Sequence, residues 1–199
     1  MIFFVNELEN ILNYIKTNLA IERNNFIDLI IVENTRVENY FSVLILKALS
    51  ELKSKKKIIH YKFQYLLKIP NNKRKHIDFL IVGKDFKAYL EIKHLAIDSE
   101  VKEKNKRTIN FYTSNSTTGK KVGIIGDLEK LNTIKNNDIT DFISFSIATN
   151  PPEQKVLNER SKFLRKQDAS KNWNIESQTS DSDKLSFIVC RKTAIKSAK

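Results

Sequence analysis

The hydrophobic pattern changes its period once in the first half of the chain, and this change restricts the possible folds. Between Val37 and Leu52 the apolar residues lie three and four positions apart, the spacing of one buried helical face. Between Ile59 and Leu67 they occupy every second position, the spacing of a β-strand. These alternating residues are expected to share one face of the strand: Ile59, Tyr61, Phe63, Tyr65 and Leu67. The chain is therefore expected to pack helices against a sheet.

Two further strands follow at short intervals. Residues 76–82 and 86–93 are mostly apolar, and Gly83-Lys84-Asp85 between them has the composition of a turn. Because the connections are so short, consecutive strands are predicted to pair antiparallel as a three-stranded meander. Residues 1–34 repeat apolar side chains at helical spacing, and Thr35 is expected to cap the next helix.

The rest of the chain indicates a loop, a helix, a fourth strand, a basic helix and a closing hairpin: residues 98–121, 122–131, 142–148, 152–167, and 173–177 with 184–192. A chain of 199 residues has the size of one domain. Within it we expect a helical extension over 1–34, a core over 35–150 and an appendix over 151–199. The predicted class is α/β, with a mixed central sheet flanked by helices.

Composition narrows the range of functions. With 41% hydrophobic and 29% charged residues, the chain is neither disordered nor an integral membrane protein. Its 35 Lys and Arg against 23 Asp and Glu give a net charge of +12, which favours a nucleic acid as partner and, second, an anionic membrane surface. Cys190 is the single cysteine, so an internal disulfide and a cysteine zinc site are excluded, and we expect a buried strand thiol. A reducing, cytoplasmic location is expected.

Two acids and a lysine stand out on the predicted hairpin. Asp78 lies in its first strand, and Glu91 and Lys93 close its second. Strand alternation places Glu91 and Lys93 on one face. An acid followed two residues later by lysine recurs elsewhere in the chain, so the hairpin context gives this triplet its interest. On the alternative interpretation, the three side chains belong to an ordinary solvated face.

The position of the turn decides how the two acids face each other. A two-residue turn at 84–85 would place Asp78 opposite Glu91. A turn at 83–84 would place Asp78 opposite Tyr89, with Glu91 on the diagonal. Either register keeps the two carboxylates on one face, ~5–8 Å apart. A three-residue loop would break this arrangement unless a bulge restored the parity.

Two carboxylates at this separation repel each other unless a cation lies between them. Mg²⁺ takes oxygen ligands, and the backbone carbonyl of Ile92 would add a third oxygen to those of Asp78 and Glu91. Mn²⁺ also suits this set. Lys93 is expected to orient an attacking water or to take part in its deprotonation. Such a set suits the hydrolysis of a phosphodiester.

Asp78 in one strand, followed by Glu91-Ile92-Lys93 at the end of the next, resembles the PD-(D/E)XK nuclease superfamily. The resemblance implies a restriction-endonuclease-like αβββαβ core. It also implies that a glutamate of the first core helix assists at the metal, for which Glu38 is the candidate and Glu33 a weaker one. Ile77 stands where the family motif has proline, which leaves the ligands intact.

The activity implied by the resemblance is Mg²⁺-dependent endonucleolytic cleavage of DNA, in restriction or defence, by a protein that forms homodimers. Basic side chains close to the site in sequence or on the basic helix are expected to contact phosphates: Lys104, Lys106, Arg107, Lys120, Lys121, Arg160, Arg165 and Lys166. Two alternatives remain open. One is a non-catalytic basic DNA-binding protein with a degenerate nuclease fold, and the other is an RNA-directed nuclease or toxin of the same fold.

Overall fold

The computed structural model describes residues 7–33, 37–68, 74–95, 114–115, 121–134, 138–148, 154–179 and 185–194. Two helices, α1 (Glu7–Glu33) and α2 (Val37–Ser54), precede the sheet. The six strands of the sheet are β1 (His60–Lys68), β2 (Arg74–Val82), β3 (Lys87–Leu95), β6 (Asp141–Ala148), β7 (Asn174–Thr179) and β8 (Ser186–Thr193). The remaining elements are β4 (Ser114–Asn115), β5 (Lys121–Val122), α4 (Gly123–Asn132), α5 (Gln154–Arg165) and the 3₁₀ helix η1 (Asp168–Ser170).

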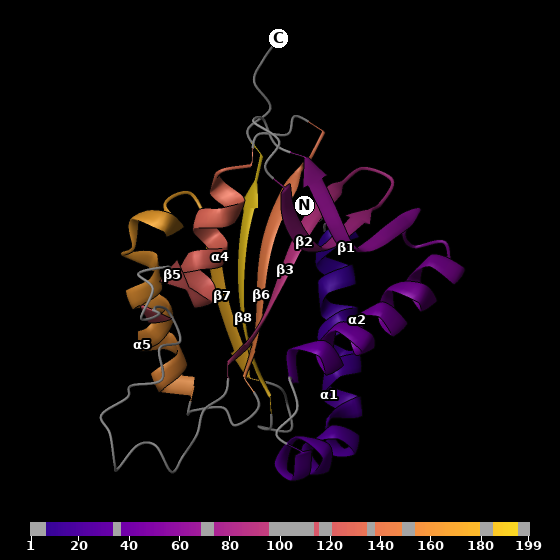
Figure 1. Cartoon of the computed structure of the whole chain (residues 1–199), viewed down its shortest axis with the longest axis horizontal. Coiled ribbons are helices and arrows are strands. Elements are labelled where there is room, and N and C mark those ends of the chain that lie inside the picture. Colours follow the sequence, from indigo (N-terminus) through magenta and orange to yellow (C-terminus); the bar gives the residue numbers. More distant parts are fainter. Residues whose placement is uncertain are drawn as a thin grey trace, which may run out of the picture.

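The strands lie in the order β1-β2-β3-β6-β8-β7. Only β3 and β6 are parallel among these neighbours; the other four pairs are antiparallel. Helices α1 and α2 cover one face of the sheet, and α4 and α5 lie on the other side (Figure 1). The protein is therefore an α/β protein with N-terminal helices and a six-stranded mixed sheet. Among the helices of these described ranges, none has the length and hydropathy that a membrane crossing needs.

Each face of the sheet has its own hydrophobic core. The first core joins α1 and α2 to alternate residues of the strands, among them Phe79, Leu90 and Phe145. The second joins α4 and α5 to the intervening residues, among them Leu80, Tyr89 and Phe142. Because a strand directs successive side chains to opposite faces, a strand that lies between two cores is buried at every position. This explains the unbroken burial of β6, although three of its residues are polar: Asp141, Ser144 and Ser146.

Most of the elements predicted from periodicity are confirmed. The meander β1-β2-β3, the helices and the closing hairpin β7-β8 all form close to the expected residues. The predicted appendix contributes more than a cap, because β8 pairs along its whole length with β6 and extends the central sheet. The predicted loop over 98–121 is wrong at two points, since β4 and β5 pair as a two-stranded sheet. Two residues are too few to show alternation in a sequence.

The β2–β3 hairpin has the first of the two registers considered from sequence. Phe79 pairs with Leu90 and Val82 with Lys87, and the amide of Gly83 donates to the carbonyl of Phe86 at 3.0 Å. Residues 84–85 therefore form the two-residue turn. A Cβ at position 83 would lie 1.9 Å from Cε1 of Phe86, so glycine gives the ring of Phe86 room to fold over the turn.

The prediction that the five alternating residues from Ile59 to Leu67 share one face is wrong. Tyr61 packs against the α1–α2 core, and the ring of Phe63 lies 5.1 Å from that of Phe79 in the same core. Tyr65 stacks on Tyr89 at 5.8 Å in the opposite core, where Leu67 is also buried. The strand therefore changes face between residues 63 and 65. The physical cause is the residue between them, since Gln64 has a left-handed φ of 48°.

Candidate functional site

Asp78 and Glu91 lie beside each other where β2 and β3 separate. The paired residues of this hairpin end at Phe79 and Leu90, and the next position in the same register sets Asp78 opposite Glu91. In place of a backbone carbonyl, the side chain of Asp78 receives the next amide of β3: the N–H of Ile92 donates to its Oδ2 at 2.8 Å. The two acids predicted from sequence are thus brought together at one gap in the sheet.

The carbonyl of Ile92 belongs to the same gap by strand geometry. In an antiparallel pair, the N–H and C=O of one residue point toward the same neighbouring strand. Since the N–H of Ile92 points toward Asp78, its carbonyl lies on the same edge of β3. The carboxylate of Asp78 and the carbonyl oxygen of Ile92 therefore lie between β2 and β3, next to Glu91.

Glu91 is the most deeply buried acid of this site, with 4% of its surface exposed. It points toward α4, where the Nζ of Lys130 donates to its Oε1 at 2.7 Å. The side chain of Lys130 is 30% exposed, so this ion pair lies at the boundary between core and solvent. Lys130 thus supplies a cation at the position where the two acids would otherwise repel each other.

Burial raises the pKa of Glu91 from 4.5 to about 8. The negative charge of Asp78 adds to the rise, the charge and hydrogen bond of Lys130 oppose it, and Asp127 of α4 raises it slightly further. A buried carboxyl with other carboxylates nearby holds its proton until a stronger positive charge arrives. A divalent ion at this gap would therefore displace a proton from Glu91.

Asp141 is a second buried acid among the described residues, and its surroundings differ. It is 3% exposed, and Arg191 contacts it at 2.8 Å while the hydroxyl of Thr140 donates to it at 2.8 Å. These contacts satisfy its charge at the start of β6, next to the Ala194 end of β8. Asp141 therefore serves as a structural ion pair, whereas Glu91 lies beside a second carboxylate.

Lys93 follows Glu91 on the same face of β3 and is half-buried. The parallel strand β6 places Ser144 opposite Glu91 and Ser146 opposite Lys93. The hydroxyls of both serines are buried and make no hydrogen bond to any described group. Buried polar groups of this kind are commonly satisfied by ordered water. The polar strip of the site thus continues from β3 onto β6.

Cys190 is next to this strip, opposite Ser144 on β8. Burial, with the charge of Asp127, raises the pKa of its thiol to about 12, against a smaller lowering by Arg165. The thiol is protonated at neutral pH and is therefore not a nucleophile. The expectation of a buried strand thiol is confirmed.

The donor set fits a hard divalent cation. Mg²⁺ in proteins is usually held by one or two carboxylates and completes its coordination with water and substrate phosphate. Asp78, Glu91 and the carbonyl of Ile92 supply that number of protein oxygens. Over the ranges that the structure describes, no three histidine, cysteine or acidic side chains converge as a fully protein-ligated metal centre requires.

Several predicted residues fall outside what the structure describes. Glu38 and Glu33 lie in helices, but their side chains are not among the described ones. The same holds for Lys121 in β5 and Arg160 in α5, while Lys104, Lys106, Arg107 and Lys120 lie outside the described residues altogether. Their proposed roles stay predictions. Lys166 is exposed directly after α5, as a phosphate contact requires.

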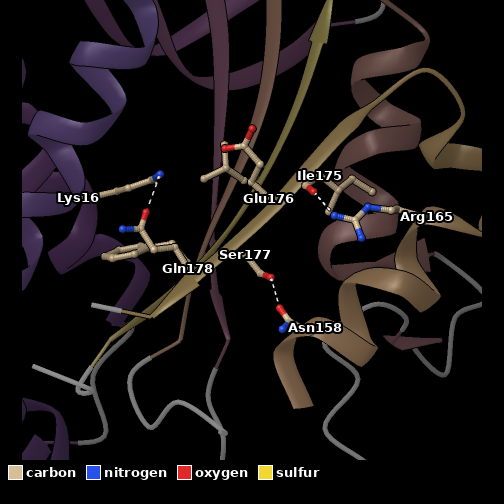
Figure 2. A pocket seen from close by; sticks show the side chains of 9 residues that line it. Lys16, Asn158, Arg165, Ile175, Glu176, Ser177 and Gln178 are labelled. Atoms are coloured by element: carbon tan, nitrogen blue, oxygen red, sulfur yellow. Dashed lines mark hydrogen bonds between the residues drawn. The ribbon is translucent and has the colours of Figure 1, made fainter. Parts of the chain in front are cut away.

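Arg165 was predicted to contact phosphate, but its guanidinium already binds a group within the protein. Its guanidinium donates to the carbonyl of Ile175 at 2.5 Å, on the edge strand β7 (Figure 2). It lines a cavity of about 440 Å³ between α1, α5 and β7, together with Lys16, Asn158, Ser177 and Gln178. In the order of strands, β7 is at the opposite end of the sheet from β1 and β2. The cavity is therefore separate from the gap beside Asp78.

Two residues at the site were not found from sequence: Lys130 and Asp127. A signal for Asp127 was present, because it lies at the edge of the apolar face of α4 formed by Ile124, Leu128 and Leu131. An acid at the edge of a buried helical face indicates a polar partner on the facing sheet. Lys130, one turn further along the helix, had no comparable signal.

Comparisons with protein-family models, with curated proteins and with solved structures gave no match. Inferences about what this site does therefore depend on its own geometry.

Proposed function

We propose that this protein is a Mg²⁺-dependent endonuclease that cleaves DNA, with Asp78 and Glu91 as metal ligands. One observation carries the proposal: the carboxylate of Asp78 binds the N–H of Ile92 and so lies against the Glu91-Ile92-Lys93 segment. Acids from two strands thereby meet at a gap in the sheet, and Lys93 follows on the same strand face.

The order of elements supports the same proposal. Apart from the two-stranded sheet β4–β5, which lies between β3 and α4, the elements α2, β1, β2, β3, α4 and β6 follow the αβββαβ order that the PD-(D/E)XK resemblance implies. The parallel pairing of β3 with β6 completes a mixed sheet. We propose on this basis that the chain has the restriction-endonuclease-like core, with α1 and the β7–β8 hairpin as additions to it.

The proposed division of labour follows from charge and position. Bound Mg²⁺ would polarise a phosphodiester and increase the acidity of the attacking water. Asp78 and Glu91 would hold the cation, and Glu91 would lose its proton on binding it. Lys93 would orient the attacking water or accept its proton, and Lys130 would add positive charge near the same site. The net charge of +12 attracts the DNA backbone.

Incubation of the purified protein with supercoiled plasmid tests the activity. We expect nicking or linearisation with Mg²⁺ or Mn²⁺ and none with EDTA. Asp78→Ala, Glu91→Ala and Lys93→Ala should each reduce the rate by about 10²-fold or more, since each removes a group that acts at the reacting phosphate. Binding of DNA should persist in all three.

Asp85→Ala and Lys84→Ala are matched controls, because they change the same residue types in the exposed turn of the same hairpin. Their cleavage rates should equal that of the unmodified protein. Retained cleavage in Asp78→Ala or Glu91→Ala would refute the assignment. A single-stranded RNA substrate in the same assay separates DNA cleavage from the RNA-directed alternative.

A second candidate is a basic DNA-binding protein whose nuclease site no longer acts. The observation that favours it is the ion pair of Glu91 with Lys130, which already gives the buried carboxylate a cation. Salt-dependent binding of DNA without any metal-dependent nicking would support this candidate.

A further inference from the structure

The backbone of Gln64 departs from regular strand geometry inside β1. Three described residues other than glycine have a positive φ: Lys56, Gln64 and Asn172. Lys56 and Asn172 lie in turns, whereas Gln64 lies inside β1. A left-handed conformation within a strand is unfavourable for any residue with a Cβ, and it persists only where the surrounding structure imposes it.

The irregularity lies directly opposite Asp78. Phe63 pairs with Phe79 and Tyr65 with Ile77, so the register on both sides of the irregularity is the same. The intervening position would pair Gln64 with Asp78, and this pair is absent from the described ladder. Both strands change face here: Phe79 packs in the α1–α2 core, and Ile77 packs in the α4–α5 core.

This change of face accounts for the position of the Asp78 carboxylate. In a regular strand the side chain of Asp78 would stand perpendicular to the sheet, out of reach of a backbone amide in the neighbouring strand. At the point where the strand turns over, the side chain is directed along the sheet. There it receives the N–H of Ile92 at 2.8 Å.

We propose that Gln64 is a positioning residue for Asp78, whose left-handed backbone opens the ladder so that the Asp78 carboxylate lies beside Glu91 at the metal site. This inference rests on the proposed function, in which Asp78 binds the metal. The backbone of Gln64 carries the effect, because its side chain is exposed and belongs to neither core.

A series of substitutions at position 64 tests the inference through Mn²⁺ affinity, measured by calorimetry in the absence of DNA. Glycine and asparagine adopt the left-handed region readily, whereas the β-branched valine strongly disfavours it. We expect Gln64→Gly and Gln64→Asn to bind Mn²⁺ within twofold of the unmodified protein. Gln64→Val should bind it at least tenfold more weakly.

Gln178→Val is the matched control, since Gln178 is an exposed glutamine in the other edge strand, β7. It should leave Mn²⁺ affinity unchanged. Thermal unfolding of every variant is measured alongside, because a purely structural role would lower the unfolding temperature of Gln64→Val without affecting its affinity for Mn²⁺.

Two results would overturn the inference: Mn²⁺ binding by Gln64→Val equal to that of the unmodified protein, or loss of binding in Gln64→Gly. The second remains decisive even where the valine variant does not fold. Mn²⁺ binding by the unmodified protein without nucleic-acid cleavage would refute the proposed function and leave this inference standing. An unmodified protein that binds no Mn²⁺ would refute both.

Discussion

The ammonium group of Lys130 lies 2.7 Å from Oε1 of Glu91, and this contact joins α4 to the strand that carries a proposed metal ligand. The ion pair is largely enclosed, with side-chain exposures of 30% for Lys130 and 5% for Glu91. Helix α4 is thus held against β3 by charge as well as by its apolar stripe. Several properties of the protein should depend on this contact.

Replacing Lys130 by methionine should destabilise the fold in alkaline solution. The substitution leaves the buried Glu91 without its cation, and the penalty applies only where Glu91 is ionised. We expect the free energy of unfolding to fall by about 1–3 kcal/mol at pH 9. The loss is smaller than for a fully buried pair because Lys130 is partly exposed. Urea unfolding in metal-free buffer measures it.

The control for this substitution is Lys47→Met, which removes a lysine from an exposed pair with Glu22 at 2.9 Å. Exposed ion pairs contribute at most about 1 kcal/mol, so this variant should differ little from the unmodified protein. An equal decrease in the free energy of unfolding in the two variants would show that the Lys130–Glu91 contact stabilises the fold no more than an exposed ion pair does.

Glu91→Gln should change how stability depends on pH. Burial raises the pKa of Glu91 to about 8 in the folded protein, against 4.5 ordinarily. Between these values the folded state holds a proton that the unfolded state has lost, so this group's contribution falls as pH rises through that window. Glutamine does not titrate and avoids the loss.

Relative to the unmodified protein, Glu91→Gln should therefore have similar stability near pH 5 and greater stability near pH 9, by on the order of a few kcal/mol. Urea unfolding of both proteins across this range, with EDTA present, measures the difference. A difference that does not vary with pH would contradict the raised pKa of Glu91.

Helix α1 should be required for folding, although sequence alone describes it as an extension. It buries Leu8, Ile11, Leu12, Ile15 and Leu19 in the same core as α2 and the sheet. Ile15→Ala should cost about 2–5 kcal/mol, the usual range for truncating a fully buried isoleucine. Ile21, which is 69% exposed on the same helix, is the control, and Ile21→Ala should change stability by less than about 0.5 kcal/mol. A comparable loss of stability in Ile15→Ala and Ile21→Ala would contradict the packing of α1 in this core.

Local sequence patterns were sufficient to predict the β2–β3 hairpin and the proximity of its two acids. The apolar runs and Gly83 indicated a short turn, and strand parity placed Asp78 and Glu91 on one face for either two-residue turn, although not for a three-residue loop without a bulge. The observed pairs from Phe79–Leu90 to Val82–Lys87 select the first alternative. Here the interacting residues are close in sequence, so short-range rules apply.

Long-range features could not be obtained in the same way. The left-handed backbone of Gln64 has no signature in its residue type, and it inverts the faces that strict alternation predicts for Tyr65 and Leu67. The ion pair between Glu91 and Lys130 spans 39 positions and depends on how α4 crosses the sheet. The pairing of β8 with β6 likewise depends on the tertiary fold.

DNA binding should involve the exposed lysine that follows α5. Lys166→Gln is expected to weaken binding to all sequences about equally and to reduce the slope of log affinity against log salt by about 1, as the loss of one phosphate contact does. Lys171→Gln is the control, because Lys171 is paired with Asp168 at 2.9 Å. Fluorescence anisotropy from 50 to 200 mM salt gives both slopes, and identical slopes in the two variants would exclude Lys166 from the interface.

A crystal soaked in Mn²⁺ and measured at the manganese absorption edge tests the central claim most directly. The account predicts one anomalous peak in the gap between β2 and β3, in contact with a carboxylate oxygen of Asp78 and of Glu91, with the ammonium of Lys130 moved away from Glu91. An anomalous map without a peak there, in a crystal where Lys130 still binds Glu91, would contradict it.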